Sequence, residues 1–354
     1  MLGVHVFNVG HGDSIVLELP DGSWGVVDCK CESPPKEPSV LRFLRAKNVQ
    51  RLAFVCLTHP HSDHFSGLPQ ILDHYGENVE EIWCFRIDSK HWSNFLTIQR
   101  NAATTSSKRR QFDELHSVFV HLRQKLRDNR VQLLDANHRL PSYGGVEIDC
   151  LAPHPKELSN YQTSLARLAE RPSQYRADEN RLSAVLRLRY GRSTVLLGSD
   201  ATTDSWIDIS RNSAKRGESL TSNLVKVSHH GSNRGFFRGA WEQIAEKGFT
   251  NGAFSAGVQY DLPHRAVISA LRELGVKLHC TNYAPSCLKT DLLDLSKFDG
   301  ISESDKLQLV MLDQSSNAKQ RVCDGDLHFQ LDVSGEVSYA HEYQGLCPFH
   351  LPVA

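Results

Sequence analysis

The sequence lacks any apolar run long enough to cross a membrane, and its N-terminus lacks the basic segment followed by an apolar one that marks a secretory signal. Neither sign of charge is in excess, because 40 lysines and arginines stand against 41 acidic residues, which gives a formal net charge of −1. No overall field therefore draws the chain to nucleic acid. The nine cysteines are odd in number and scattered, which argues against a secreted disulfide framework. We therefore expect a cytoplasmic protein that does not associate with membranes.

Three histidines and one aspartate fall within six consecutive positions, at His59, His61, Asp63 and His64. Just before them, residues 52–57 form an apolar stretch with the length and bulk of a buried strand. A strand that ends in a tight turn can point His59 and His61 at one cation, and Asp63 and His64 can face a second. Imidazole and carboxylate are ligands that zinc, manganese and iron accept. The strand before the cluster favours a metal site over a polar turn that happens to contain histidines.

This cluster resembles the signature of the metallo-β-lactamase fold, and other segments resemble further landmarks of that fold in chain order. Residues 6–14 resemble the opening of the hydrolase domain of ComEC/Rec2-type DNA-uptake proteins, with Asn8 and His11 where that family has Asp and Gln. Residues 225–232, which contain a double histidine, match another segment of that family almost letter for letter. The remaining landmarks are Asp28 after a short strand, Asp200 at the end of residues 193–200, and the segment 257–264. The resemblance covers roughly residues 4–282.

The resemblance implies an α/β fold of the αββα type, a four-layer sandwich in which two mixed β-sheets lie face to face and helices cover both outer sides. The sequence supports this fold independently, because helix-like segments alternate with strand-like runs; they are 38–48, 66–75 and 237–247. We predict one large hydrolase domain over residues 1–282, with a basic insertion at about 88–130. A C-terminal extension follows over residues 283–354, and three of its segments read as short strands: 307–312, 327–331 and 336–339.

The resemblance also implies two divalent metal ions, with zinc or manganese as the expected metals, that activate water for hydrolysis. Asp200, at a strand end, is expected to bridge the ions. His229 is expected to complete the ligands of the second ion together with Asp63 and His64. His230 is then expected to contact a ligand or the substrate, although the sequence leaves open which of the two adjacent histidines ligates.

Three further residues are candidates for the site. Asp28 is expected to orient a ligand histidine. His154 follows a good strand, and is either the third histidine of the first ion or an ordinary loop histidine, in which case that ion keeps an open position. His264 lies just before a predicted amphipathic helix at 265–274. It either donates a hydrogen bond to a phosphate or protonates a leaving oxygen, or it simply caps the helix.

Local charge differs from the overall balance. From Lys90 to Arg130 there are nine lysines or arginines against three acidic residues, a net charge of +6 (9 − 3). Residues 111–129 show helical periodicity with one apolar face. This segment is either a solvated basic helix packed on the surface or a wall that attracts phosphate beside the metal site.

The C-terminal part contains four of the nine cysteines, with two histidines nearby. The sequence leaves open whether they form a structural zinc site or are scattered buried or free thiols. The residues are Cys280, Cys287, Cys323, Cys347, His328 and His350.

The favoured function is that of a metal-dependent phosphodiesterase or nuclease, with nucleic acid or another phosphodiester as the substrate. One alternative is the hydrolysis of a different bond, such as a lactone, thioester, phosphocholine ester or β-lactam. Another is a metal-stabilised effector subunit of a larger complex. A fold of this kind hosts many reactions, so the site must decide between them. The sequence leaves open whether the chain binds a protein partner or forms an oligomer.

Overall fold

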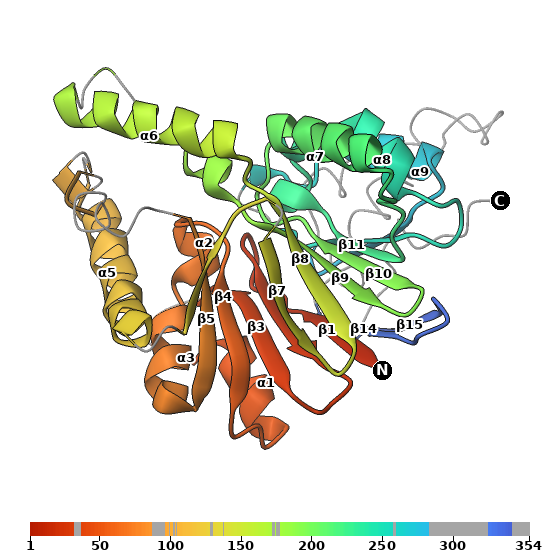
Figure 1. The fold of residues 1–354 in the computed structure, drawn as a ribbon, viewed down its shortest axis with the longest axis horizontal. Coiled ribbons are helices and arrows are strands. Elements are labelled where there is room, and N and C mark those ends of the chain that lie inside the picture. Colours follow the sequence, from red (N-terminus) through yellow and green to blue (C-terminus); the bar gives the residue numbers. More distant parts are fainter. Residues whose placement is uncertain are drawn as a thin grey trace, which may run out of the picture.

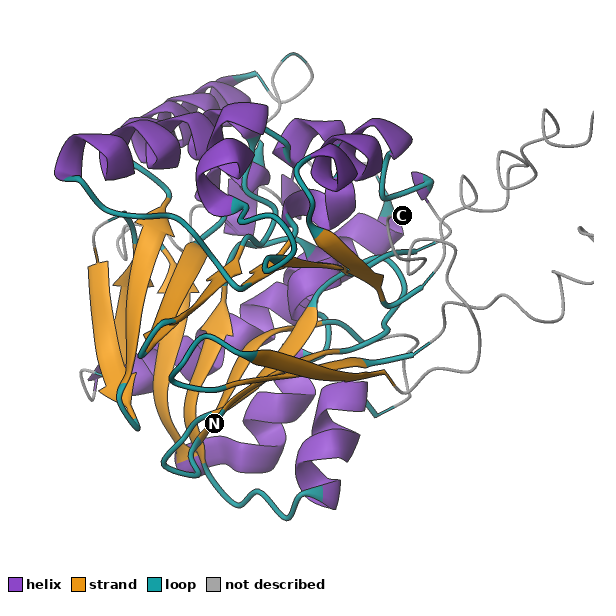
Figure 2. Cartoon of the chain, turned by 90° about the vertical axis from the view of Figure 1, so that its right-hand side faces the viewer, coloured by secondary structure: helices purple, strands orange, loops and turns teal. Residues whose placement is uncertain are grey.

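The computed structural model describes residues 1–31, 37–86, 96–98, 100–101, 103, 105–127, 130–136, 138–171, 174, 178–257, 260–282 and 325–341. Two β-sheets lie face to face in the middle of the molecule, and helices cover the outer side of each (Figure 1). A view turned by 90° shows the same order of layers, with the strands between two groups of helices (Figure 2). The αββα sandwich predicted from the sequence is therefore confirmed.

The first sheet has eight strands among the described residues, in the order β15-β14-β1-β2-β3-β4-β5-β6. The strands β3 to β6 run parallel, and the other pairs are antiparallel. All six residues of β4 are buried, as expected for a parallel strand covered on both faces. The bounds are β1 Leu2–Val6, β2 Ser14–Glu18, β3 Trp24–Cys29, β4 Leu52–Leu57, β5 Val79–Phe85, β6 Val131–Leu134, β14 Leu327–Leu331 and β15 Val337–His341.

The second sheet has seven strands among the described residues, in the order β13-β12-β11-β10-β9-β8-β7. The strands β10 to β13 run parallel, and β7 to β10 are antiparallel to their neighbours. The carboxyl ends of β10 and β11 therefore lie at the same edge of this sheet. The bounds are β7 His138–Tyr143, β8 Val146–Ala152, β9 Val185–Tyr190, β10 Ser193–Leu197, β11 Leu224–Lys226, β12 Asn251–Phe254 and β13 Lys277–Cys280.

The helices that pack on the first sheet are α1 (Ser39–Ala46), α3 (Leu68–Tyr75) and α5 (Ser106–Arg127), and those on the second are α7 (Thr203–Arg216), α8 (Arg238–Ile244) and α9 (Arg265–Glu273). The shorter connecting elements are α2 (Ser62–Phe65), η1 (Gly76–Asn78), η3 (Glu179–Leu182), η4 (Ser228–Gly231) and η5 (Asn233–Gly235), and α6 spans Pro155–Glu170. The helices predicted at 38–48, 66–75, 237–247 and 265–274 are confirmed, with ends within three residues of the predicted ones.

Three apolar cores hold the layers together. The core between the sheets includes the stacked rings of Phe54 and Trp83, whose centroids are 3.7 Å apart. The helices of the first sheet bury a second core, which includes Leu115 of α5. The helices of the second sheet bury a third core, which contains Trp206 and Trp241. Burial of such apolar surface is the main stabilising contribution to this fold.

The predicted C-terminal extension contributes to the first sheet, because β14 pairs with β1 and β15 pairs with β14. The strand predicted at 307–312 lies outside the described residues, as do Cys287, Cys323, Cys347 and His350. Cys280 is buried. Among the helices of the described ranges, none combines the length and apolar character that a bilayer crossing requires.

Candidate metal centre and active site

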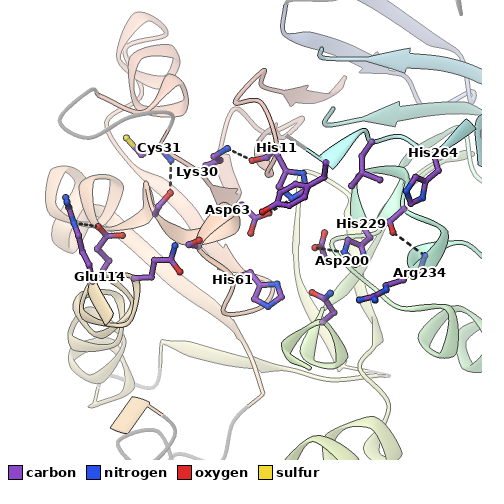
Figure 3. Close-up of a pocket in the computed structure, with 18 residues that line it drawn as sticks. His11, Lys30, Cys31, His61, Asp63, Glu114, Asp200, His229, Arg234 and His264 are labelled. Atoms are coloured by element: carbon purple, nitrogen blue, oxygen red, sulfur yellow. Dashed lines mark hydrogen bonds and ion pairs between the residues drawn. The ribbon is translucent and has the colours of Figure 1, made fainter. Parts of the chain in front are cut away.

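The candidate ligands meet where strands of both sheets end. Residues 59–64 follow β4 and continue into α2, while Asp28 lies near the end of the neighbouring β3. Asp200 follows β10, and His229 and His230 follow β11 in η4. Side chains from both sheets therefore surround one pocket. Figure 3 shows Asp63, from the first sheet, and Asp200, from the second, on opposite sides of this pocket.

The two carboxylate oxygens of Asp200 face two different pairs of histidines. Its Oδ2 lies 3.8 Å from the Nε2 atom of His59 and 3.8 Å from the Nε2 atom of His229. Its Oδ1 lies 3.4 Å from the Nε2 atom of His64 and 3.4 Å from the Nε2 atom of His230. A buried carboxylate between two sets of nitrogen donors has the placement of a ligand that bridges two cations.

Several buried polar atoms of this cluster have no hydrogen-bond partner among the described residues. They include His59 Nε2, His64 Nε2, His230 Nε2 and Asp200 Oδ1. Buried polar groups are normally paired, so orphaned atoms that converge on one space indicate a ligand. Because imidazole nitrogens and carboxylate oxygens are donors for divalent zinc and manganese, the residues fit such ions. A divalent ion bound there supplies Lewis acidity to water and to an ester oxygen.

The charges in the cluster suit cation binding. Burial alone would raise the pKa of Asp200, but the surrounding histidines, His230 first, hold that pKa well below its usual range. The same balance applies to Asp63, because burial alone would raise its pKa but the neighbouring His11 and His230 hold that pKa well below the usual range. Burial lowers the pKa of His59 well below its usual value. Ionised carboxylates and neutral imidazoles are the forms that bind metal ions.

Asp28 fixes the orientation of His64. Its Oδ2 accepts hydrogen bonds from His64 Nδ1 and Thr58 Oγ1, both at 2.7 Å, and its Oδ1 accepts one from Thr58 N at 2.9 Å. With the proton on Nδ1, the Nε2 atom of His64 is left to face Asp200. Burial raises the pKa of Asp28, and the nearby His64 opposes that rise. This geometry is what the predicted orienting role of Asp28 requires.

Asp13 lies beside Nδ1 of His230 at a longer distance and without a hydrogen bond, and the sequence interpretation missed this contact. The carboxylate lies 3.4 Å from His230 Nδ1, while Lys226 Nζ lies 2.8 Å and 2.9 Å from its two oxygens. Burial alone would raise the pKa of Asp13, but Lys226 and then His230 hold it below the usual value. Both members of the ion pair lie in segments that carry the family resemblance, but no spacing rule links positions so far apart in the chain.

His11 is a second residue that the sequence interpretation did not assign to the site. It was noted there only because the resembling family has Gln at this position. Its Nε2 lies 3.2 Å from Asp63 Oδ2, and its ring lies against Tyr260 with centroids 4.5 Å apart. The neighbouring Gly12 has a φ of +136°, and a Cβ atom there would lie 2.5 Å from the carbonyl oxygen of Asp63. Only glycine therefore allows the two loops to approach this closely.

His61 faces an acidic residue that the sequence interpretation did not consider. Its Nε2 lies 3.5 Å from Glu179 Oε2, at the start of η3, which leads into β9. Burial would lower the pKa of His61, but Glu179 outweighs burial and raises it. Glu179 therefore faces Nε2 of His61, whereas Asp28 and Asp13 face the Nδ1 atoms of their histidines.

His154 is not brought to the cluster. It forms the N-cap of α6, and its Nε2 lies 3.0 Å from the side-chain nitrogen of Asn212 on α7. Burial lowers its pKa. The structure thus places His154 as a loop and cap residue, which was one of the two alternatives that its sequence position left open.

His264 lines the pocket and is the N-cap residue of α9, without a side-chain capping hydrogen bond. Its Nδ1 accepts a hydrogen bond from the backbone nitrogen of Asn233 at 3.0 Å, and its own backbone nitrogen donates to Gly231 O at 3.0 Å. Because Nδ1 is an acceptor, the neutral ring carries its proton on Nε2 and can donate it. Gly231 has a φ of +82°, and a Cβ atom there would lie 2.4 Å from Pro263, which explains the glycine.

The pocket has a volume of about 730 Å³ and lies between α5 and the loop after η4 (Figure 3). Figure 3 shows Glu114 of α5 on one wall and Arg234 and His264 on the opposite one, and Arg110, whose Nε lies 3.3 Å from Glu114 Oε1, also lines the pocket. Its lining residues are His11, Lys30, Cys31, His61, Ser62, Asp63, Ser66, Arg110, Gln111, Glu114, Asn180, Asp200, His229, Ser232, Arg234, Tyr260, Leu262 and His264.

The basic segment contributes only in part to this pocket. Lys125 and Arg130 both lie 3.0 Å from Glu77, and Arg100 lies 3.0 Å from Asp113. Lys125 is buried, so these ion pairs bind part of the basic charge to the protein itself. Arg110, in contrast, reaches the pocket wall.

Residues 8–129 match a family model described as the metallo-beta-lactamase superfamily. No curated protein matches the sequence. Solved structures match at low identity, and each TM-score is below 0.5. Tm1679, a metal-dependent hydrolase of the beta-lactamase superfamily, is 12% identical with a TM-score of 0.43, over 79% of this chain and 96% of that one. Zn²⁺-bound PqqB from Methylobacterium extorquens is 11% identical with a TM-score of 0.42, over 78% and 97% of the two chains.

A mutant of the CmlA beta-hydroxylase is 13% identical with a TM-score of 0.39, over 78% of this chain but only 45% of that one, so this chain spans less than half of that protein. The match to the metallo-beta-lactamase superfamily model covers about a third of the chain, and the two facing sheets and the cluster of potential metal ligands among the described residues are consistent with it.

Proposed function

We propose that this protein hydrolyses phosphodiester bonds, with a nucleic acid or a nucleotide-sized phosphodiester as the substrate, at a site that holds two divalent ions. The observation that carries the proposal is the set of phosphate-binding groups beside the Asp200 cluster. Arg110, Arg234 and His264 line the same pocket as Asp63 and Asp200. Guanidinium groups match the oxygens of a phosphate in charge and geometry.

Different side chains of the site would have different roles in the reaction. Arg234 and Arg110, from opposite walls, would bind and orient the phosphate. His264, with its proton on Nε2, would donate to a phosphate oxygen or to the leaving oxygen. Its Nδ1 bond to the backbone of Asn233 holds the ring in that tautomer. Asp28 and Asp13 keep the ligand histidines in their orientations, so little rearrangement is needed when the substrate arrives.

Tyr260 gives the pocket an aromatic rim. Its side chain is 57% exposed and packs edge-on against His11 at the mouth of the site. Exposed aromatic rings beside cationic groups stack on unpaired bases, and each stacked base contributes about 1–3 kcal/mol. We therefore expect single-stranded nucleic acid or a small nucleotide diester to be preferred over a duplex. The resemblance to the hydrolase domain of DNA-uptake proteins supports the same substrate class.

The test is a panel of substrates offered to the protein loaded with Zn²⁺ or Mn²⁺. It contains single-stranded and double-stranded DNA, RNA, bis-p-nitrophenyl phosphate, a lactone, a thioester, a phosphocholine ester and a β-lactam. Turnover of the phosphodiesters alone supports the proposal. Preferential turnover of a carboxylic ester or lactam would replace it with one of the other ester-type hydrolases. No turnover of any member would favour the effector subunit, which the mass of the native assembly would then test.

A further inference from the structure

The first ion has too few histidines if only residues 59–64 supply it. His59 and His61 are two expected ligands, and His154, for which the sequence left open a third ligand role, is engaged with α6 and Asn212. Among the described residues, His229 also faces this side of Asp200, because its Nε2 lies 3.8 Å from Oδ2, the same distance as His59 Nε2 from that oxygen.

The second set is complete without His229. His230 is fully buried, with Nε2 3.4 Å from Asp200 Oδ1 and 3.6 Å from Asp63 Oδ2. His64 faces the same Oδ1 atom at 3.4 Å. Asp13 lies behind His230 as Asp28 lies behind His64, which is the arrangement that proteins use to orient metal-binding imidazoles.

The backbone of η4 explains how adjacent residues can point to different places. His229 and His230 both adopt left-handed conformations, with φ angles of 51° and 53°. Two consecutive residues of this kind are costly for side chains other than glycine, and such strain is found mainly at functional sites. The turn is fixed beside the bridging residue, because His229 N donates to Ser199 O at 2.8 Å. The two rings are 78° apart in plane, with centroids separated by 6.4 Å.

We propose that the double histidine supplies one ligand to each ion: His229 joins His59 and His61 at the first ion, and His230 joins Asp63 and His64 at the second. Asp200 contributes Oδ2 to the first set and Oδ1 to the second. This inference rests on the two-ion site of the proposed function, but not on the identity of the substrate. His229 thus takes the third-histidine position of the first ion, for which the sequence offered His154 as one alternative.

The experiment measures Zn²⁺ and Co²⁺ content per chain after equilibration at a fixed free metal concentration, together with the visible spectrum of the Co²⁺ form. Wild-type protein should bind about two ions. His229→Ala and His230→Ala should each bind about one, with different Co²⁺ spectra because different donors remain. His154→Ala, the matched histidine control, should keep both ions and the wild-type spectrum.

Double variants show which ion each histidine serves. His230→Ala combined with Asp63→Asn damages one site twice, so one ion should remain. His229→Ala combined with Asp63→Asn damages both sites, so metal should be lost almost completely. His229→Gln and circular dichroism guard against misfolding of the alanine variants. Full metal content in His229→Ala, or loss of an ion in His154→Ala, would overturn the assignment. If the metal pattern holds but no phosphodiester is cleaved, only the proposed function fails.

Discussion

Lys226 and Asp13 form a fully buried ion pair, in which Nζ lies 2.8 Å and 2.9 Å from the two carboxylate oxygens and each side chain is 1% exposed. The pair joins the end of β11 to the N-terminal loop between β1 and β2, and its carboxylate faces His230. A buried charge is tolerated only when it is paired, so this contact links folding to the metal centre.

Asp13→Asn should act on stability and on metal binding at once. The change leaves Lys226 buried without a counter-charge, which should lower the free energy of unfolding by about 3–5 kcal/mol. It should also weaken binding of one ion by about 10–100-fold, because His230 loses its orienting acceptor. Combining Asp13→Asn with Lys226→Met should restore much of the stability in urea titrations but not the metal affinity. If both recover together, Asp13 has no orienting role.

Asp200→Asn should reduce the content of both ions, because it removes the charge of the carboxylate that lies between the two sets of histidines. Elemental analysis of wild-type protein should give between one and two transition-metal ions per chain. Asp204→Asn, an exposed acid on α7 whose carboxylate lies 3.5 Å from Arg181, is the matched control and should leave metal content unchanged. A metal-free wild-type protein with full hydrolytic activity would refute the assignment of a catalytic metal centre to this site.

His264→Gln should lower kcat by about 10²–10⁴-fold if the ring donates a proton in the transition state. Metal content should stay at the wild-type level, because His264 interacts with η4 and η5 rather than with Asp200. Single-turnover rates and metal analysis on the same preparation test both statements. Loss of metal in this variant would make His264 a ligand instead.

Arg110→Gln should weaken binding of single-stranded DNA and reduce the slope of log affinity against log salt concentration by roughly one unit. The structural reason is that Arg110 lines the pocket. Its i,i+4 ion pair with Glu114 contributes little to stability, because the side chain of Arg110 is largely exposed. Arg139→Gln is the charge-matched control, since Arg139 lies on β7 and pairs with Glu147. Equal effects of the two changes would assign the basic segment a structural role. Tyr260→Ala, compared with Tyr260→Phe, tests base stacking in the same assay.

Because of His5, the free energy of unfolding should decrease as the pH falls below about 6.5. Burial, with smaller contributions from His328 and Lys47, lowers its pKa to about 3, and Glu18 lies 3.6 Å from its Nε2. The unfolded chain therefore binds the extra proton near pH 6.5 and the folded chain only near pH 3, so stability is lost as the pH falls between these values. The slope contributed is up to about 1.4 kcal/mol per pH unit. His5→Gln should flatten it in urea titrations, whereas His116→Gln, on the surface of α5, should not.

The fold and the ligand-bearing loops were predictable because their signals are local. The run 52–57 is apolar over its whole length, which identified β4, and the ligand motif follows it directly. The helix at 111–129 was recognised from its apolar periodicity, and α5 does bury Leu115 and Val118. These patterns depend only on neighbours within a few turns of chain.

The parts of the site that were missed depend on contacts between distant segments. Asp13 and Lys226 meet only because β1 and β11 belong to opposite sheets that are packed together, and no periodicity reports such a pairing. Glu179 precedes β9 in a short 3₁₀ helix whose position follows from the sheet order. The different directions of the His229 and His230 side chains could not be predicted. They depend on two consecutive residues in the left-handed backbone conformation, which is uncommon for residues other than glycine.

The pairing of β14 with β1 has a consequence for how this protein can be shortened. Five residue pairs join the two strands, and Asn8 N also donates to Asp326 Oδ1 at 2.7 Å. A chain cut after residue 282 would leave β1 as an open edge, with a row of unpaired backbone groups that another chain can bind. Such a fragment is expected to self-associate, so the hairpin protects the border of the sheet against aggregation.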